Sequence, residues 1–270
     1  MLFTVLWLST LILSAILSIH NTRGKSLVDL GSFEQISYAE NDKVKLLFSV
    51  AEQLKIPLIQ IARTSEQARN SDRLNSYETI EDIADSAIQL LDSLLLSLRL
   101  HEAADNLVLQ PVSLSAVLHD IAHTMQIATK QHGCDVELHI GGKYEPIMAH
   151  PAGLVAALSS LGSVFIDAQN QRTVNYRPVI KISAHRTRYG ITAGLFSDIE
   201  GLSSDSFKRA KHTYGSSRQP LSQLTAHSGA GVFIADSLLE VMSSRLRVAK
   251  HQKLSGLAAT FTPSKQMELV

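Results

Sequence analysis

Two histidines one helical turn apart have types and spacing that suit metal binding. In HDIAH, His119 and His123 are four residues apart, so a helix here would place both imidazoles on one face. The motif lacks the glutamate of H-E-x-x-H, Asp120 is a shorter carboxylate, and no third ligand is specified. We therefore predict a solvated helix face and no metal site.

Glycines near a helix start can bring backbone N–H groups close to a phosphate. SGAG (228–231) places Gly229 and Gly231 at an expected helix start, although an ordinary turn explains the pair equally well. The acidic turn LFSDIEGLSS (195–204) and the basic stretch KRAKHTYGSSRQ (208–219) are also candidates for ligand binding, and each is also typical of a solvated loop. Walker, Rossmann and G-x-S-x-G fingerprints are absent from the sequence.

A proline lies inside an amphipathic helical pattern in EQLKIPL (52–58). Pro57 removes a backbone donor and clashes with the carbonyl four residues earlier, which costs about 3 kcal/mol inside a helix. The proline therefore indicates a helix bend that serves a function. Glu52 precedes this bend by just over one helical turn.

The composition excludes several classes of protein. The 270 residues carry a formal net charge of zero and no basic stripe, so we predict no nucleic-acid partner. Cys134 is the single cysteine, which excludes an intramolecular disulfide and a multi-cysteine metal site. We expect an ordinary buried thiol at this position.

The N-terminal segment is predicted to anchor the chain in a membrane. Residues 2–19 are mostly apolar and uncharged, and about 18 residues are just enough to cross a hydrocarbon core. A signal peptide is the alternative, but a basic leading region and an A-x-A site are missing. Arg23 and Lys25 follow the span, so we expect a single pass through the inner (cytoplasmic) membrane, with the N-terminus outside and the soluble part cytoplasmic.

Two amphipathic helices are expected after a linker at 20–36. Apolar residues recur every three or four positions over about 38–70 and again over about 77–103, and the polar segment 69–76 is predicted to separate them. The stripes consist of Leu47, Val50, Leu54, Leu58 and Ile61, then Ile80, Ile83, Ala87, Leu91, Leu94 and Leu98. Because one hairpin (37–104) cannot bury both stripes, we favour a homodimeric four-helix bundle over packing on the chain's own next domain.

Residues 105–264 are predicted to form a mixed α+β layer, followed by a tail at 265–270. Helices are expected at 113–131, 151–168 and from Gly231, and strands at 135–140, 179–184, 190–197, 245–250 and 257–262. The segment 198–228 is expected to be a polar loop. Several strands are adjacent in sequence, which favours helices on one face of a mixed sheet.

The order of anchor, hairpin and α/β layer resembles a sensor histidine kinase of two-component systems, over about residues 40–264. EQLKIPL resembles the family's phosphoacceptor box H-E-L-R-T-P-L. The segment LQPVSLSAVLHDIAHTMQIATKQHGCDVELHI resembles the start of the ATP-binding domain, and SGAGVFIADSLLEVMSSRLRV with SGLAATFTP resembles the second glycine box and the closing strand. The resemblance implies a dimerisation hairpin and a histidine-kinase-type ATPase domain.

Departures from the family pattern fall at the residues that would perform catalysis. Glu52 stands at the phosphoacceptor histidine, and Ser160 and Val164 stand at the two key positions of the N box, where the family uses asparagine and holds Mg²⁺. Valine cannot ligate a hard cation. The resemblance assigns nucleotide contacts to Asp198, Gly201, Gly229 and Gly231, and it makes 208–219 part of an ATP lid.

These residues predict a pseudokinase that acts by dimerisation and by docking a partner, either an active histidine kinase or a response regulator. Such a protein would bind ATP or ADP without Mg²⁺, or no cofactor. One alternative is an active, ATP-dependent sensor histidine kinase with unusual motifs. Another is a structural membrane scaffold that reuses the fold.

Overall fold

The computed structural model describes residues 47, 50, 51, 54–66, 73–170, 177–199, 201–213 and 229–264. The predicted anchor (2–19), the linker (20–36), Glu52 and the tail (265–270) lie outside these residues. Residues 54–66 are helical, and α2 (Arg73–Glu102) is a second helix of 30 residues. The polar separation predicted for 69–76 is wrong at 73–76, which are helical; this stretch contains no glycine or proline to stop a helix.

The rest of the described chain combines helices and strands as predicted. In chain order the elements are η1 (Ala104–Asn106), β1 (Gln110–Val112), α3 (Leu114–His132), β2 (Asp135–Ile140), β3 (Ile147–Ala149), α4 (Pro151–Asn170), β4 (Val179–Thr187), β5 (Gly190–Ser197), α5 (Ser204–Thr213), α6 (Gly229–Val241), β6 (Arg247–His251) and β7 (Leu254–Phe261). Five strands form a sheet in the order β2-β4-β5-β7-β6, in which only β2 and β4 are parallel. The antiparallel pair β1-β3 forms a second, small sheet.

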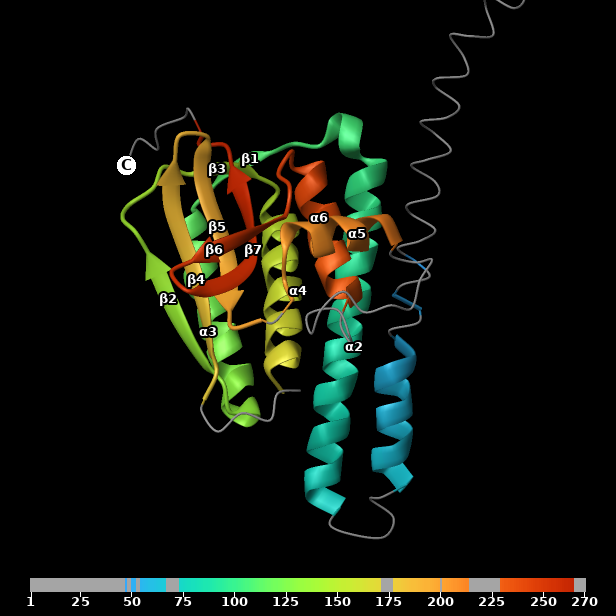
Figure 1. Ribbon diagram of the computed structural model, residues 1–270. Helices are drawn as coiled ribbons and strands as arrows, with labels where there is room; N and C mark the ends of the chain where they lie inside the picture. Colours follow the sequence, from blue (N-terminus) through green and yellow to red (C-terminus); the bar gives the residue numbers. More distant parts are fainter. Residues whose placement is uncertain are drawn as a thin grey trace, which may run out of the picture. The chain divides into compact units, whose positions relative to one another are not determined.

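The core lies between the inner face of the five-stranded sheet and helices α3 and α4, with α6 packed on α4 (Figure 1). Strand register aligns apolar residues on this face, for example Ile182 with Leu195 and Leu195 with Leu257. All three side chains are buried. Alternation of apolar residues along the strands therefore determines which face the helices cover.

The opposite face of the sheet carries polar and histidine side chains. Lys181 Nζ lies 3.0 Å from Glu137 Oε2, and His139 Nε2 lies 3.2 Å from the same oxygen. The His251 ring packs between Phe196 and His139, with ring centroids 5.3 and 5.8 Å away. The His251 side chain, at the end of β6, therefore packs over this face of the sheet. The Ser183 hydroxyl oxygen lies 3.3 Å from His251 Nδ1.

The predicted polar loop at 198–228 is wrong in part, because Ser204–Thr213 form α5. Two serines cap this helix reciprocally. The Ser206 N–H donates to Ser203 Oγ (3.1 Å), and the Ser203 N–H donates to Ser206 Oγ (2.9 Å). This arrangement has the logic of a capping box, with serine where glutamate or glutamine is usual. Phe207 and Ala210 are its buried residues on the core side.

Within the described residues, one helical stretch is long and apolar enough to cross a membrane, Pro151–Gln169 of α4. Its most apolar window is 61% buried inside the protein, as expected for a core helix. The membrane anchor predicted from the sequence is a different segment, 2–19, and it remains a prediction.

Candidate functional site

Helix α4 carries both positions that the resemblance assigns to the N box. Ser160 and Val164 are one turn apart on α4, and both are buried, with Val164 only 2% exposed. Helix α6 packs directly against them at Gly231. A Cβ atom on Gly231 would lie 2.6 Å from Val164 Cγ2 and 3.3 Å from the Ser160 carbonyl oxygen. The close approach of α6 to α4 therefore requires glycine at 231, and Val164 fills the space beside it.

Asp198 lies just after β5, and its side chain is exposed. Its carbonyl oxygen accepts a hydrogen bond from Gln169 Nε2 (3.4 Å), which places it beside the C-terminal end of α4. Gly201 follows in the turn before α5 with a φ of 72°, a left-handed conformation that glycine adopts without strain. The Gly201 carbonyl oxygen accepts a hydrogen bond from Ser206 Oγ (3.0 Å).

Asp198 and the glycines of α6 therefore lie beside α4, at different points along its length. Gly229 is the first residue of α6, two residues before the contact with Val164, and it is half-buried. Val164 and Gln169 are five residues apart, or about 7.5 Å along a helix. The start of α6 and the Asp198 turn thus both contact the C-terminal half of α4. A helix N-terminus and a carboxylate that both lie beside α4 are groups that could contact different parts of one nucleotide.

An ion pair between a half-exposed lysine and a buried aspartate, which sequence patterns did not reveal, joins α5 to α6. Lys211 Nζ lies 2.5 Å from Asp236 Oδ2, and Asp236 Oδ1 accepts a hydrogen bond from the Leu246 N–H (3.2 Å). Burial raises the pKa of the Asp236 carboxyl, and the hydrogen bond and charge of Lys211 oppose that rise. The signal in the sequence was the single aspartate in the apolar run GVFIADSLL. Its partner, 25 positions earlier, could not be read from that run.

The other residues identified from the sequence lie apart from these contacts. Pro57 is in the helical stretch 54–66 and is half-buried. Residues 52 and 53, which precede this stretch, lie outside the described part, so the bend stays a prediction. His119 and His123 are exposed on α3, and the described residues contain no group of three potential ligands that could hold a metal ion. Cys134 is buried, and burial raises the pKa of its thiol.

The residues present do not fit a magnesium ion at the N-box position. Mg²⁺ requires oxygen ligands in octahedral geometry, whereas the Val164 side chain carries no oxygen and lies with its Cγ2 methyl group against Gly231. The Ser160 carbonyl oxygen lies near the same glycine, inside the contact between the two helices. This part of the site is therefore an apolar helix–helix contact.

Comparison with known proteins relates the chain to histidine kinases by structure alone. No family model and no curated protein matches the sequence. A solved structure of the Acinetobacter baumannii histidine kinase AdeS aligns with a TM-score of 0.51 and 11% identity, over 78% of this chain and 98% of the chain in that structure. Full-length ShkA in complex with AMPPNP aligns with a TM-score of 0.50 and 18% identity, over 81% of this chain and 46% of ShkA. The resemblance inferred from the sequence is confirmed at the level of the fold, which is histidine-kinase-like.

Proposed function

We propose that this chain is a two-component signalling protein that has lost autokinase chemistry and acts by dimerising and docking a partner. The observation that carries the proposal is the contact between Val164 and Gly231. At the position where the resemblance requires an asparagine and Mg²⁺, two helices are in apolar contact. The partner would be an active histidine kinase or a response regulator.

Loss of the metal would remove most of what an enzyme contributes to phosphoryl transfer. The metal bridges phosphate oxygens and neutralises the charge that develops on them. Without a ligand at 164, and with Glu52 in place of the phosphoacceptor histidine, both the donor and the acceptor sides of the reaction are impaired. The two changes are independent, so reversing one would not restore activity.

Nucleotide binding without catalysis fits the remaining candidates. Gly229 at the start of α6 and the exposed Asp198 turn keep a helix N-terminus and a carboxylate near α4. ShkA, a structural neighbour, is described in complex with AMPPNP. We propose that ATP or ADP would bind here without Mg²⁺, as a structural ligand.

Exposed apolar side chains on both hairpin helices support the proposed homodimer. Leu58 and Ile59 on the first helix are exposed, as are Leu91 and Leu95 on α2. Of the stripe predicted on α2, Leu94 is buried in this chain's own core, whereas Leu91 is exposed. Leu91 and Leu95 are one turn apart, so together they form a stripe that a second copy could cover in a four-helix bundle. The predicted anchor at 2–19 would hold such dimers at the cytoplasmic membrane.

Incubation of the purified full chain with radiolabelled ATP and Mg²⁺ tests the proposal directly. We expect no label on wild type and none on Glu52→His, because the metal position would still be valine. A calorimetric titration with ADP, with and without Mg²⁺, should show binding that Mg²⁺ does not strengthen.

Acid-labile label on any histidine would refute the pseudokinase and favour an active kinase. Absence of any nucleotide binding would instead favour a scaffold that merely reuses the fold. Sedimentation of the full chain as a monomer at micromolar concentration would contradict the dimer.

A further inference from the structure

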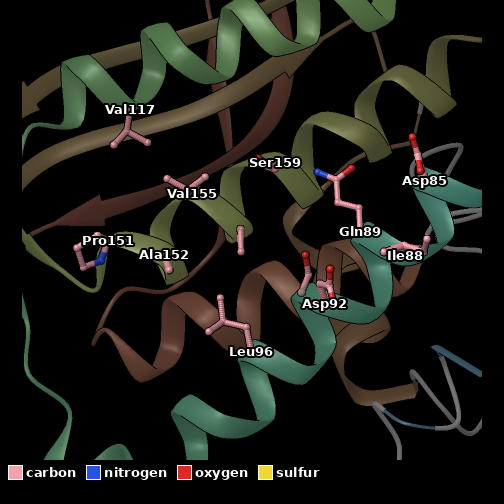
Figure 2. A pocket seen from close by; sticks show the side chains of 12 residues that line it. Asp85, Ile88, Gln89, Asp92, Leu96, Val117, Pro151, Ala152, Val155 and Ser159 are labelled. Carbon is pink, nitrogen blue, oxygen red and sulfur yellow. The ribbon is translucent and has the colours of Figure 1, made fainter. Parts of the chain in front are cut away.

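A groove runs between α2 and helices α3 and α4, and none of the candidate nucleotide residues Asp198, Gly201, Gly229 and Gly231 lines it. Its volume is about 730 Å³, and Figure 2 shows the side chains that line it. One wall is α2, from Asp85 to Leu96. The other wall is the N-terminal half of α4, from Pro151 to Ser159, together with Val117 of α3.

The walls of the groove are mainly apolar and partly open to solvent. Ile88 is 55% exposed, and Val155, on the opposite wall, is 43% exposed. Leu96, Val117 and Ala156 are half-buried beneath them. An elongated apolar surface of this kind, open on one side, matches the way a helix docks its apolar face.

Two carboxylates define the charge of the groove. Asp85 and Asp92 are seven residues apart on α2, so both project from nearly the same side of the helix. None of the twelve residues that line the groove is Lys, Arg or His. In the part of the chain that the structure describes, neither carboxylate forms an ion pair. Within the described part of the chain, the groove therefore combines apolar walls with two carboxylates that no basic side chain neutralises.

The stripe proposed for dimerisation lies on another side of α2. At 100° per residue, Leu91 and Leu95 point about 100° and 60° away from Asp92, whereas Asp85 and Leu96 lie within about 40° of it. Only Ile88 stands at the border between the two surfaces. A dimer contact formed through Leu91 and Leu95 would be centred about 80° from Asp92 and about 100° from Asp85 around α2, and so would not be centred on the carboxylates.

We propose that this groove binds a helix of a partner protein, apolar on one face and flanked by Lys or Arg side chains. Apolar residues of that helix contact Ile88 and Val155, and two basic residues about two turns apart pair with Asp85 and Asp92. The α2 wall from Asp85 to Leu96 is about 16 Å long, which accommodates about three turns. Since the two walls belong to different parts of the chain, the partner helix would bridge the hairpin helix and the α/β layer.

Photo-cross-linking of two synthetic peptides to the purified full chain tests this site. Both peptides have 14 residues, leucines on one helical face and a central benzophenone; one carries lysines on the other face, and the other carries glutamates. We expect the lysine peptide to label residues within 85–96, 117 or 151–159, mapped by mass spectrometry, and the glutamate peptide not to. Labelling should weaken at high salt, because exposed charges are screened.

Variants with matched controls distinguish specific peptide binding in the groove from non-specific binding of an apolar peptide. Asp85→Asn and Asp92→Asn should each raise the half-saturating concentration of the lysine peptide about 1.5- to 5-fold. Val155→Lys should raise it more than about 10-fold, because a charge would be buried against the peptide and would repel its lysines. Glu102→Gln, on the same helix beyond the groove, and Val108→Lys, at another exposed valine, should change nothing. Circular dichroism would verify that every variant is folded.

Three results would overturn the proposal. The first is equal labelling by the two peptides. The second is labelling of the groove that the double variant Asp85→Asn/Asp92→Asn leaves unchanged. The third is cross-linking of a benzophenone amino acid placed at 155 to a second copy of this chain without added peptide, which would assign the groove to self-association.

Discussion

Replacing Lys211 by methionine would show what holds α5 in place. Asp236 is 4% exposed, and without Lys211 its carboxylate would keep, among the described residues, the hydrogen bond from the Leu246 N–H. Breaking a fully buried pair costs about 3–5 kcal/mol. The Lys211 side chain is 37% exposed and water can partly replace it, so we expect about 1–3 kcal/mol. For a domain of this size, that loss lowers Tm by roughly 2–12 °C.

The pH dependence of this loss identifies its cause. Burial already raises the pKa of the Asp236 carboxyl above its usual 3.8, and removing Lys211 would raise it further. A raised pKa in the folded state means that the associated stability is present at low pH and is lost as the pH rises through that pKa. The deficit of Lys211→Met relative to wild type should therefore be full at pH 7 and smaller at pH 4.5.

Thermal unfolding of the full chain, followed by circular dichroism at both pH values, measures this deficit. Asp236→Asn is the matched control, since its amide oxygen can still accept from Leu246 while Lys211 turns to solvent; it should cost about 1 kcal/mol. The reasoning would be refuted by a deficit for Lys211→Met that is equal at pH 7 and pH 4.5. It would also be refuted if Asp236→Asn were the more damaging change at pH 7.

Two further predictions concern helix packing and the sheet face. Gly231→Ala should destabilise the protein by about 1–3 kcal/mol, because its methyl group would overlap Val164, and Val164→Ala in the same chain should recover part of this loss in thermal unfolding. Wild-type stability for Gly231→Ala would contradict the packing contact. Burial, then His139, His185 and Lys181, lower the pKa of His251, so its contribution to stability should be present above pH 6.5 and lost as the pH falls below that value. His251→Gln should flatten this part of the stability profile measured by urea unfolding, and an unchanged slope would exclude His251 as its source.

The elements that sequence patterns predict well are those whose own residues specify them. Strands β4 and β5 alternate apolar and other residues, and α4 is apolar over most of its length, so their types and approximate bounds follow from local periodicity. Strands β1 and β3 were missed because three-residue strands carry no periodicity. They exist through pairing across 39 positions, Gln110 with Ala149. Helix α5 was missed because most of its residues are polar and its N-terminal capping pair consists of two serines, Ser203 and Ser206.

The candidate site shows the same division between local and distant information. The valine at 164 and the glycines at 229 and 231 are visible in the sequence. The contact between Val164 and Gly231 is not visible there, because it depends on how α6 crosses α4. The Lys211–Asp236 pair likewise joins two helices whose relative placement only the fold determines.

Helix α2 contacts α6 and α4 at its C-terminal end, where Ser97 Oγ lies 2.8 Å from Ser237 Oγ and Leu100 lies against Gly153. Its earlier residues supply the stripe proposed for pairing. Inserting one residue between these regions would turn one by about 100° relative to the other, whereas seven residues turn it by only about 20° short of two full turns. Among natural variants of this chain, insertions and deletions within α2 should therefore occur in multiples of seven residues. Selection would impose this pattern even at positions where the amino-acid type is free to vary.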